Sequence, residues 1–257
     1  MIQEELISLA LPYPDREDRL VRVFVPAHDE GELLPGFYMT DGQNLFDKES
    51  SGYGCWFTRE AVRLEHNSCG RSAVIVGIHN DDLNRTNDLT PASIGPVSIA
   101  EASQQIRPQG EVFDDFIIHT VMPTVESRFP VKTGRMYTAV CGSSSGGLQA
   151  FFTAMSHPEI FGAAGVFSPA FLLYDQVDLN RWIVEKLREE KPFLYFYSGA
   201  GDDLENNISK STVRTYSALK EIYPASFLRL VLLPEMPHHE VAWEPVFRDF
   251  LHLFLQL

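Results

Sequence analysis

The stretch "CGSSSGGLQAFFTAMSHP", residues 141–158, places three serines between glycines directly after an apolar run. The preceding run, "RMYTAVCG" (135–142), is typical of a buried strand, and "GGLQAFFTAMSHP" (146–158) is typical of a helix that ends at a proline. Residues 142–146 fit the pattern G-x-S-x-G with Ser144 at its centre. A strand, a tight turn and a helix in this order predict that Ser144 is a nucleophile on a strained turn.

Two neighbouring serines, Ser143 and Ser145, are rival candidates, but neither occupies the central position of the pattern. The glycines have a physical purpose, because bulky neighbours would clash on so tight a turn. The helix that follows also points its first amides toward the serine, where they can stabilise an oxyanion.

Outward from this turn, short apolar runs alternate with segments of helical period. Crossover helices between strands predict an α/β protein with a mainly parallel central sheet, so we expect one three-layer α/β/α domain over residues 1–257. The strands are expected at 5–11, 20–26, 35–42, 72–80, 135–142, 163–169, 192–199 and 227–233, and the helices at 55–66, 111–129, 146–158, 179–191, 207–223 and 241–255. The irregular segment 81–110 is long for a compact domain, and such loops are usually functional or mobile.

An activated serine needs a base, and the base needs an acid that orients it. In parallel sheets, ligands bind at the carboxyl ends of the strands, so both partners are sought there. "YSGAGDDLENN" (197–207) supplies Asp202, Asp203 and Glu205 after one strand, and "EMPHHEVAW" (235–243) supplies His238 and His239 after the last. The order serine, acid, histidine is that of α/β-hydrolases.

Composition limits the class of partner. The chain has 257 residues, 44% of them hydrophobic, and a formal charge of −14. This charge disfavours nucleic acid and anionic membranes, which both require clustered Lys and Arg. The N-terminus has no basic segment followed by an apolar one, and three cysteines without CxxC spacing indicate neither a disulfide framework nor a zinc site. We therefore expect a cytoplasmic protein with reduced thiols.

No metal site is predicted. Side chains of adjacent residues diverge, so His238, His239 and Glu240 make a weak ligand set. The segment 81–93 has the acidic and amide residues of a calcium loop but lacks its glycine at position six, and Ser93 stands where the closing glutamate belongs.

The chain resembles the esterase D group of α/β-hydrolases, which includes feruloyl esterases, enterobactin-type esterases and mycolyl transferases. The resemblance runs from about Phe37 to the C-terminus. It is carried by "YMTDGQNLFD" (38–47) together with "CGSSSGGLQAFFTAMSHPEIFG" (141–162), and more weakly by "IVGIHN" (75–80), "RTNDLTP" (85–91), "YSGAGDD" (197–203) and "HHEVAW" (238–243).

The resemblance implies a catalytic triad of Ser144, Asp202 and His238. The acid of the family usually stands three residues after the glycine that ends its strand, which gives Asp202 with Asp203 as the rival. The histidine commonly precedes a tryptophan by five residues, which gives His238. The sequence departs from the common pattern at His239, where Asn or Asp often stands.

The resemblance further implies an oxyanion hole made by the backbone N–H groups of Gln43 and Ser145. Phe171 either lines the acyl pocket or belongs to the ordinary core. No cofactor is implied.

The predicted function is hydrolysis of short-chain acyl or hydroxycinnamoyl esters through an acyl-enzyme, with a small-molecule ester as the partner. The alternatives are an acyltransferase on the same scaffold and a non-catalytic binding module that retains the fold. The oligomeric state is left open, a homo-oligomer included.

Overall fold

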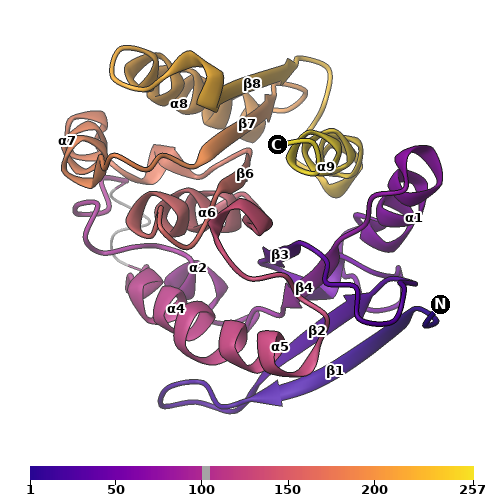
Figure 1. The fold of residues 1–257 in the computed structure, drawn as a ribbon. Helices are drawn as coiled ribbons and strands as arrows, with labels where there is room; N and C mark the ends of the chain where they lie inside the picture. The colour runs from indigo at the N-terminus through magenta and orange to yellow at the C-terminus, as the bar shows by residue number, and fades with distance from the viewer. Residues whose placement is uncertain (100–104) are drawn as a thin grey trace.

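Eight strands form one sheet in the computed structural model, which describes residues 1–99 and 105–257 (Figure 1). The strand order is β1-β2-β4-β3-β5-β6-β7-β8. The hairpin β1–β2 is antiparallel, β2 also runs antiparallel to β4, and every pairing from β4 to β8 is parallel. The strands are β1 (Glu5–Leu11), β2 (Arg19–Val25), β3 (Gly36–Met39), β4 (Val74–Ile78), β5 (Thr138–Ser143), β6 (Ala163–Phe167), β7 (Phe193–Gly199) and β8 (Leu228–Leu233).

Helices cover both faces of this sheet. Strands β3 to β6 are buried at every position, as expected for parallel strands covered on both sides. One apolar cluster lies under α1 (Thr58–Cys69) and α9 (Glu240–Phe254). A second lies on the opposite face (Figure 1), under α4 (Gly110–Phe116), α5 (Met122–Arg128), α6 (Ser145–Ser156), α7 (Gln176–Lys186) and α8 (Asp203–Lys220). The predicted three-layer α/β/α fold is confirmed.

The helix predicted over 111–129 is interrupted. Helix α4 passes into a π-helical turn, η2 (Ile117–Val121), and α5 follows it with Pro123 in its first turn. Proline has no backbone N–H and its ring crowds the preceding turn. A π-turn widens the helix next to such a position, so the segment continues without breaking.

The irregular segment after β4 is partly anchored. It contains the short helix α2 (Arg85–Asp88), and Asp88 is fully buried, where its carboxylate accepts hydrogen bonds from Arg16 (2.8 Å) and Arg19 (2.9 Å). This pairing holds α2 against the β1–β2 hairpin. Residues 100–104 of the predicted loop lie outside the described residues.

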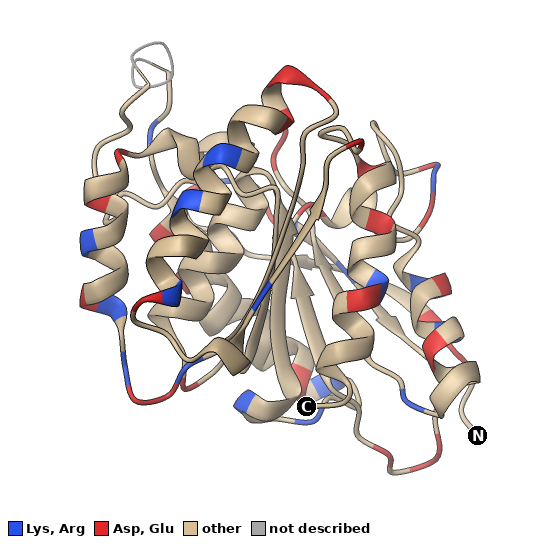
Figure 2. Ribbon diagram, turned by 90° about the horizontal axis from the view of Figure 1, so that it is seen from above, with Lys and Arg blue, Asp and Glu red and all other residues tan. Residues whose placement is uncertain are grey.

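Acidic side chains outnumber basic ones along the chain, 35 to 21, and they occur on helices and loops around the sheet (Figure 2). Within residues 1–99 and 105–257, no helix has the length and apolar character needed to cross a membrane.

Candidate active site

Ser144 lies between β5 and α6 with backbone angles of φ 59° and ψ −125°. This conformation is strained for a residue with a side chain and is characteristic of functional turns. Its backbone N–H donates to the carbonyl of Phe167 (3.0 Å), and its own carbonyl accepts from Leu148 and Ala170. The neighbouring strand and helix therefore hold the turn that presents Ser144.

Two glycines are required for this turn. A Cβ atom on Gly142 would lie 2.4 Å from the Thr40 hydroxyl, and one on Gly146 would lie 2.1 Å from the same atom. Both distances are shorter than real Cβ contacts, so the chain can pass this close to β3 only with glycine. The G-x-S-x-G pattern is thus explained by packing around Ser144.

His238 follows β8 in a loop and reaches the same pocket as Ser144. Its Nδ1 donates to the Oε2 atom of Glu205 at 2.5 Å, and its ring meets Trp243 edge to face at 5.0 Å between centroids. Because Nδ1 carries the proton toward a carboxylate, Nε2 is left as the basic atom of the imidazole.

Glu205 is completely buried. Its Oε1 atom accepts from the Ser168 hydroxyl (2.7 Å), the Ser198 hydroxyl (2.9 Å) and the Gly199 N–H (2.6 Å). Burial alone would raise the pKa of Glu205, but the bonds from His238, Gly199 and the two serines outweigh it and lower the pKa. Glu205 is therefore an anion held in one orientation behind His238.

The acid expected at this place, Asp202, has a different set of partners. Its Oδ1 accepts from the backbone N–H of Glu205 (2.8 Å) and its Oδ2 from the backbone N–H of His238 (2.7 Å). These two bonds, the one from Glu205 first, lower the pKa of Asp202. Asp202 thus contacts the main chain beside the imidazole, and the predicted rival Asp203 is exposed in the first turn of α8.

The difference arises from where α8 begins. The helix was expected from 207 but begins at Asp203, with Asp202 as its N-cap. The Asp202 carboxylate accepts from the amide three residues on, that of Glu205, while the Glu205 side chain turns to Gly199 and His238 and not back to the cap. The pattern Asp202-x-x-Glu205 is a capping-box signature, so it indicates the start of the helix but not the contact between Glu205 and His238.

The predicted oxyanion donors come from two different elements. Ser145 is the first residue of α6, and Gln43 lies in the short 3-10 helix η1 (Gly42–Asn44) that follows β3. First-turn N–H groups have no acceptor within their own helix, so they can bind an anion. Gln43 is held by a bond from the Ser50 hydroxyl to its carbonyl (2.9 Å).

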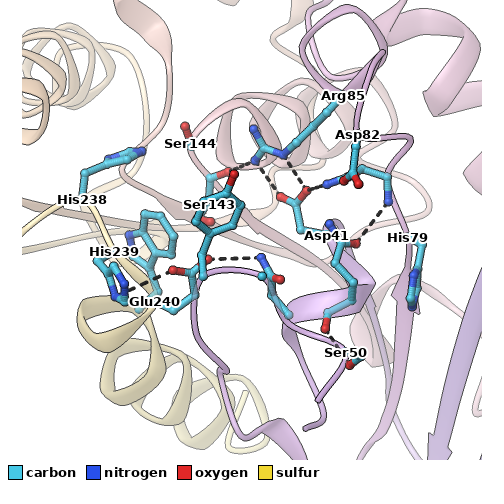
Figure 3. Close-up of a pocket in the computed structure, with 16 residues that line it drawn as sticks. Asp41, Ser50, His79, Asp82, Arg85, Ser143, Ser144, His238, His239 and Glu240 are labelled. Carbon is cyan, nitrogen blue, oxygen red and sulfur yellow. Dashed lines mark hydrogen bonds and ion pairs between the residues drawn. The ribbon is translucent and has the colours of Figure 1, made fainter. Parts of the chain in front are cut away.

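An ion pair between the buried Asp41 and the half-buried Arg85 supports this loop, and sequence reasoning did not single it out. Arg85 from α2 donates twice to Asp41, at 2.7 Å each, and also lies 3.4 Å from the carbonyl of Ser143 (Figure 3). Asn80 donates to the same carboxylate at 2.5 Å. Burial opposes the charge of Asp41, but Arg85 and Asn80 outweigh it, so the pKa of Asp41 is lowered.

Asp41 has a positive φ of 55° and precedes Gly42 and Gln43 directly. The ion pair therefore fixes the turn that carries one predicted oxyanion donor. Through the carbonyl of Ser143 it also connects that turn to the residue before the nucleophile.

These groups surround one pocket with a volume of about 900 Å³. Ser144 and His238 lie on its wall with Gln43, Arg85 and Glu240 (Figure 3). Phe171, expected either here or in the core, is 1% exposed and packs against Phe151 at 5.0 Å, away from the pocket lining. It belongs to the core.

The structure also places the rival serine Ser143 and the rival histidine His239. The side chain of Ser143 is buried at the end of β5. His239 is the N-cap of α9, where its Nδ1 accepts from the Val241 N–H (3.2 Å), and its side chain is 48% exposed at the pocket edge. Within residues 1–99 and 105–257, no group of three or more His, Cys, Asp or Glu side chains is arranged to hold a metal ion.

This fold and pocket can be compared with known families. The model of the family described as "Putative esterase" matches residues 16–223, so the chain belongs to that esterase family. The resemblance drawn from the sequence motifs is confirmed.

Two curated relatives are esterases by name. The chain is 27% identical over 160 residues to an endo-1,4-beta-xylanase/feruloyl esterase from Xylanibacter ruminicola, which covers 62% of this chain and 18% of the relative. It is 31% identical over 165 residues to a siderophore triacetylfusarinine C esterase from Aspergillus fumigatus, which covers 60% and 52%. The chain thus aligns with about a fifth of the first relative and half of the second.

Solved structures share the fold across nearly the whole chain. The siderophore hydrolase EstA from Aspergillus nidulans superposes with a TM-score of 0.74 at 18% identity, covering 98% of this chain and 94% of that one. An IroE-like serine hydrolase from Shewanella oneidensis gives 0.72 at 20% identity, with 98% and 78% covered.

Proposed function

We propose that this protein is a serine carboxylesterase that acts through an acyl-enzyme, with Ser144, His238 and Glu205 as its triad. The observation that carries the proposal is the Glu205–His238 pair, which faces the pocket that also contains the strained Ser144 turn. Asp202, first expected as the acid, holds the His238 loop through the main chain instead.

The chemistry follows from these positions. Nε2 of His238 takes the proton as the Ser144 oxygen attacks the ester carbonyl, and the imidazolium then protonates the leaving alcohol. Glu205 keeps the imidazole in the tautomer that leaves Nε2 free and stabilises its charged form. The N–H groups of Gln43 and Ser145 stabilise the oxyanion, and a water molecule activated by His238 releases the acid.

The substrates are carboxylic esters with short-chain acyl or hydroxycinnamoyl groups. The family and the names of the two curated relatives support the ester class, and the size of the pocket admits an acyl group of this kind. The location in the cytoplasm and the oligomeric state stay predictions.

Labelling with a fluorophosphonate tests the proposal, because only an activated serine reacts with it. The wild-type protein should be labelled and should hydrolyse 4-nitrophenyl butyrate. Ser144→Ala should lose both properties, with a fall in kcat on the order of a million-fold. The matched control Ser143→Ala should keep both; labelling of Ser144→Ala would overturn the assignment.

A further inference from the structure

The pocket beside Ser144 contains acidic groups that the proposed reaction does not use. Glu240 and Asp82 both line it, in addition to the Asp41–Arg85 pair (Figure 3). Glu240 comes from the first turn of α9, and Asp82 from the loop after β4. They lie on different elements, so they bring negative charge to the cavity from two sides.

Glu240 is the more informative of the two because it is buried, at 6% exposure. Its Oε1 accepts one hydrogen bond, from the side-chain amide of Asn44 at 3.1 Å. Its Oε2 lies 3.8 Å from Nδ1 of His239, which is a cation only when protonated. Burial raises the pKa of Glu240 and Asp41 adds to the increase, against the opposing effects of its own backbone N–H, His239 and Arg85.

Among the described residues, the one ion-pair partner of Glu240 is His239, and the charge of Arg85 acts on the carboxylate from beyond ion-pair distance. Arg85 is the one lysine or arginine in the described lining of the pocket, and both of its side-chain bonds of 2.7 Å go to Asp41. Asp82 likewise has no lysine or arginine within ion-pair distance in the described part of the chain. A buried carboxylate without a paired cation is electrostatically costly, and a cationic ligand would relieve that cost.

Asn80 contributes a further polar group behind this wall. Its Oδ1 atom is buried and has no hydrogen-bond partner among the described residues, whereas its amide nitrogen donates to Asp41. The negative charge of the wall next to the nucleophile therefore comes from the carboxylates of Glu240 and Asp82.

From this arrangement we infer that the pocket selects esters that carry a positively charged group, an alkylammonium or a guanidinium, and that Glu240 is the residue that recognises it. The inference rests on the proposed esterase function and names its substrate class. An ammonium group would donate to the Oε2 atom of Glu240, in competition with the His239 imidazole, while the ester carbonyl lies at Ser144. Esters that carry a carboxylate would be disfavoured by the same charges.

The test uses substrates of equal length that differ in one terminal group. The acyl series consists of 4-nitrophenyl 6-aminohexanoate, which is a cation, 4-nitrophenyl 6-hydroxyhexanoate, a neutral donor, and 4-nitrophenyl heptanoate, which is apolar. In the alcohol half, butyrylcholine carries a quaternary ammonium that tests the charge without an N–H donor, and 3,3-dimethylbutyl butyrate is its neutral isostere. In at least one of the two halves, kcat/KM for the cation should exceed that of its neutral partners by about tenfold, the effect of one charge-assisted contact.

Glu240→Gln tests the residue, because glutamine keeps an oxygen for Asn44 and removes only the charge. The cation preference should fall to near unity in this variant. The matched control is Glu30→Gln, an exposed acid in the loop before β3, whereas the pocket lies at the other end of that strand. It removes the same single negative charge and should leave the preference unchanged.

The outcomes separate the two proposals. Failure to hydrolyse any of the five esters would overturn the esterase function. Hydrolysis without a cation preference, or a higher rate on the hydroxyl ester than on the amine, would overturn the charge selection alone. A preference that survives Glu240→Gln, or that Glu30→Gln also abolishes, would overturn the role of Glu240.

Discussion

Replacing Glu205 with glutamine is the sharpest test of the proposed triad, because the structure fixes how the amide of the glutamine must lie. The Oε1 atom of Glu205 accepts a hydrogen bond from the backbone N–H of Gly199 at 2.6 Å, and the strand fixes the direction of this donor. The amide oxygen must therefore take this position, which leaves the NH2 group facing Nδ1 of His238. Two donors cannot share that contact, so the imidazole must move its proton to Nε2.

An imidazole with its proton on Nε2 cannot accept the proton of Ser144. The corresponding change of tautomer in serine proteases lowers kcat by about ten-thousand-fold, or about 5.5 kcal/mol at 1.36 kcal/mol per factor of ten. We expect a loss of this size in the hydrolysis of 4-nitrophenyl butyrate. Circular dichroism would check that the variant is folded, and the ¹⁵N shifts of His238 would report the tautomer directly.

Asp202→Asn is the matched control. The asparagine can keep one of the two main-chain bonds, so it should cost about 1 kcal/mol of stability, as the loss of an N-cap does. Its activity should fall less than a hundredfold. The reasoning is refuted if Asp202→Asn shows the ten-thousand-fold loss while Glu205→Gln remains active.

Three further predictions concern the triad histidine and the groups around the triad. His238→Ala should lose nearly all esterase activity, whereas His239→Ala should keep most of it, because the His239 imidazole caps α9. The reverse result in the same assay would exchange the roles of the two histidines. Arg85→Gln should lower kcat by about tenfold to a hundredfold with KM nearly unchanged, because the ion pair with Asp41 positions an oxyanion donor that acts on the transition state. Partial recovery of kcat in Arg85→Lys would support this role, and a change confined to KM would contradict it. The pKa of Asp41 is lowered from 3.8 in the folded protein, so its charge stabilises the fold fully above that value and ceases to do so as the pH falls through the lower folded pKa. In urea unfolding between about pH 4 and pH 2, Asp41→Asn should therefore lose less stability than wild type. Equal losses would contradict the assignment.

The sequence by itself determined the parallel sheet and the turn at Ser144. Both are indicated by local patterns: buried apolar runs bounded by turn residues specify the strands, and G-x-S-x-G between a strand and a helix marks the turn. The structure adds the reason for the glycines, which is the close approach to Thr40. The histidine was placed in the pocket for the same reason, since it follows the last strand directly.

Tertiary structure alone decided which carboxylate meets the imidazole. Asp202 and Glu205 lie three residues apart at the start of α8, and the N-cap bond of Asp202 uses its own carboxylate while turning Glu205 inward toward His238. It also decided the partners of Arg85 and Glu240, whose contacts with Asp41 and Asn44 span 44 and 196 residues of sequence. Such contacts depend on how strand ends and helix termini come together in the folded sheet, and no local pattern specifies them.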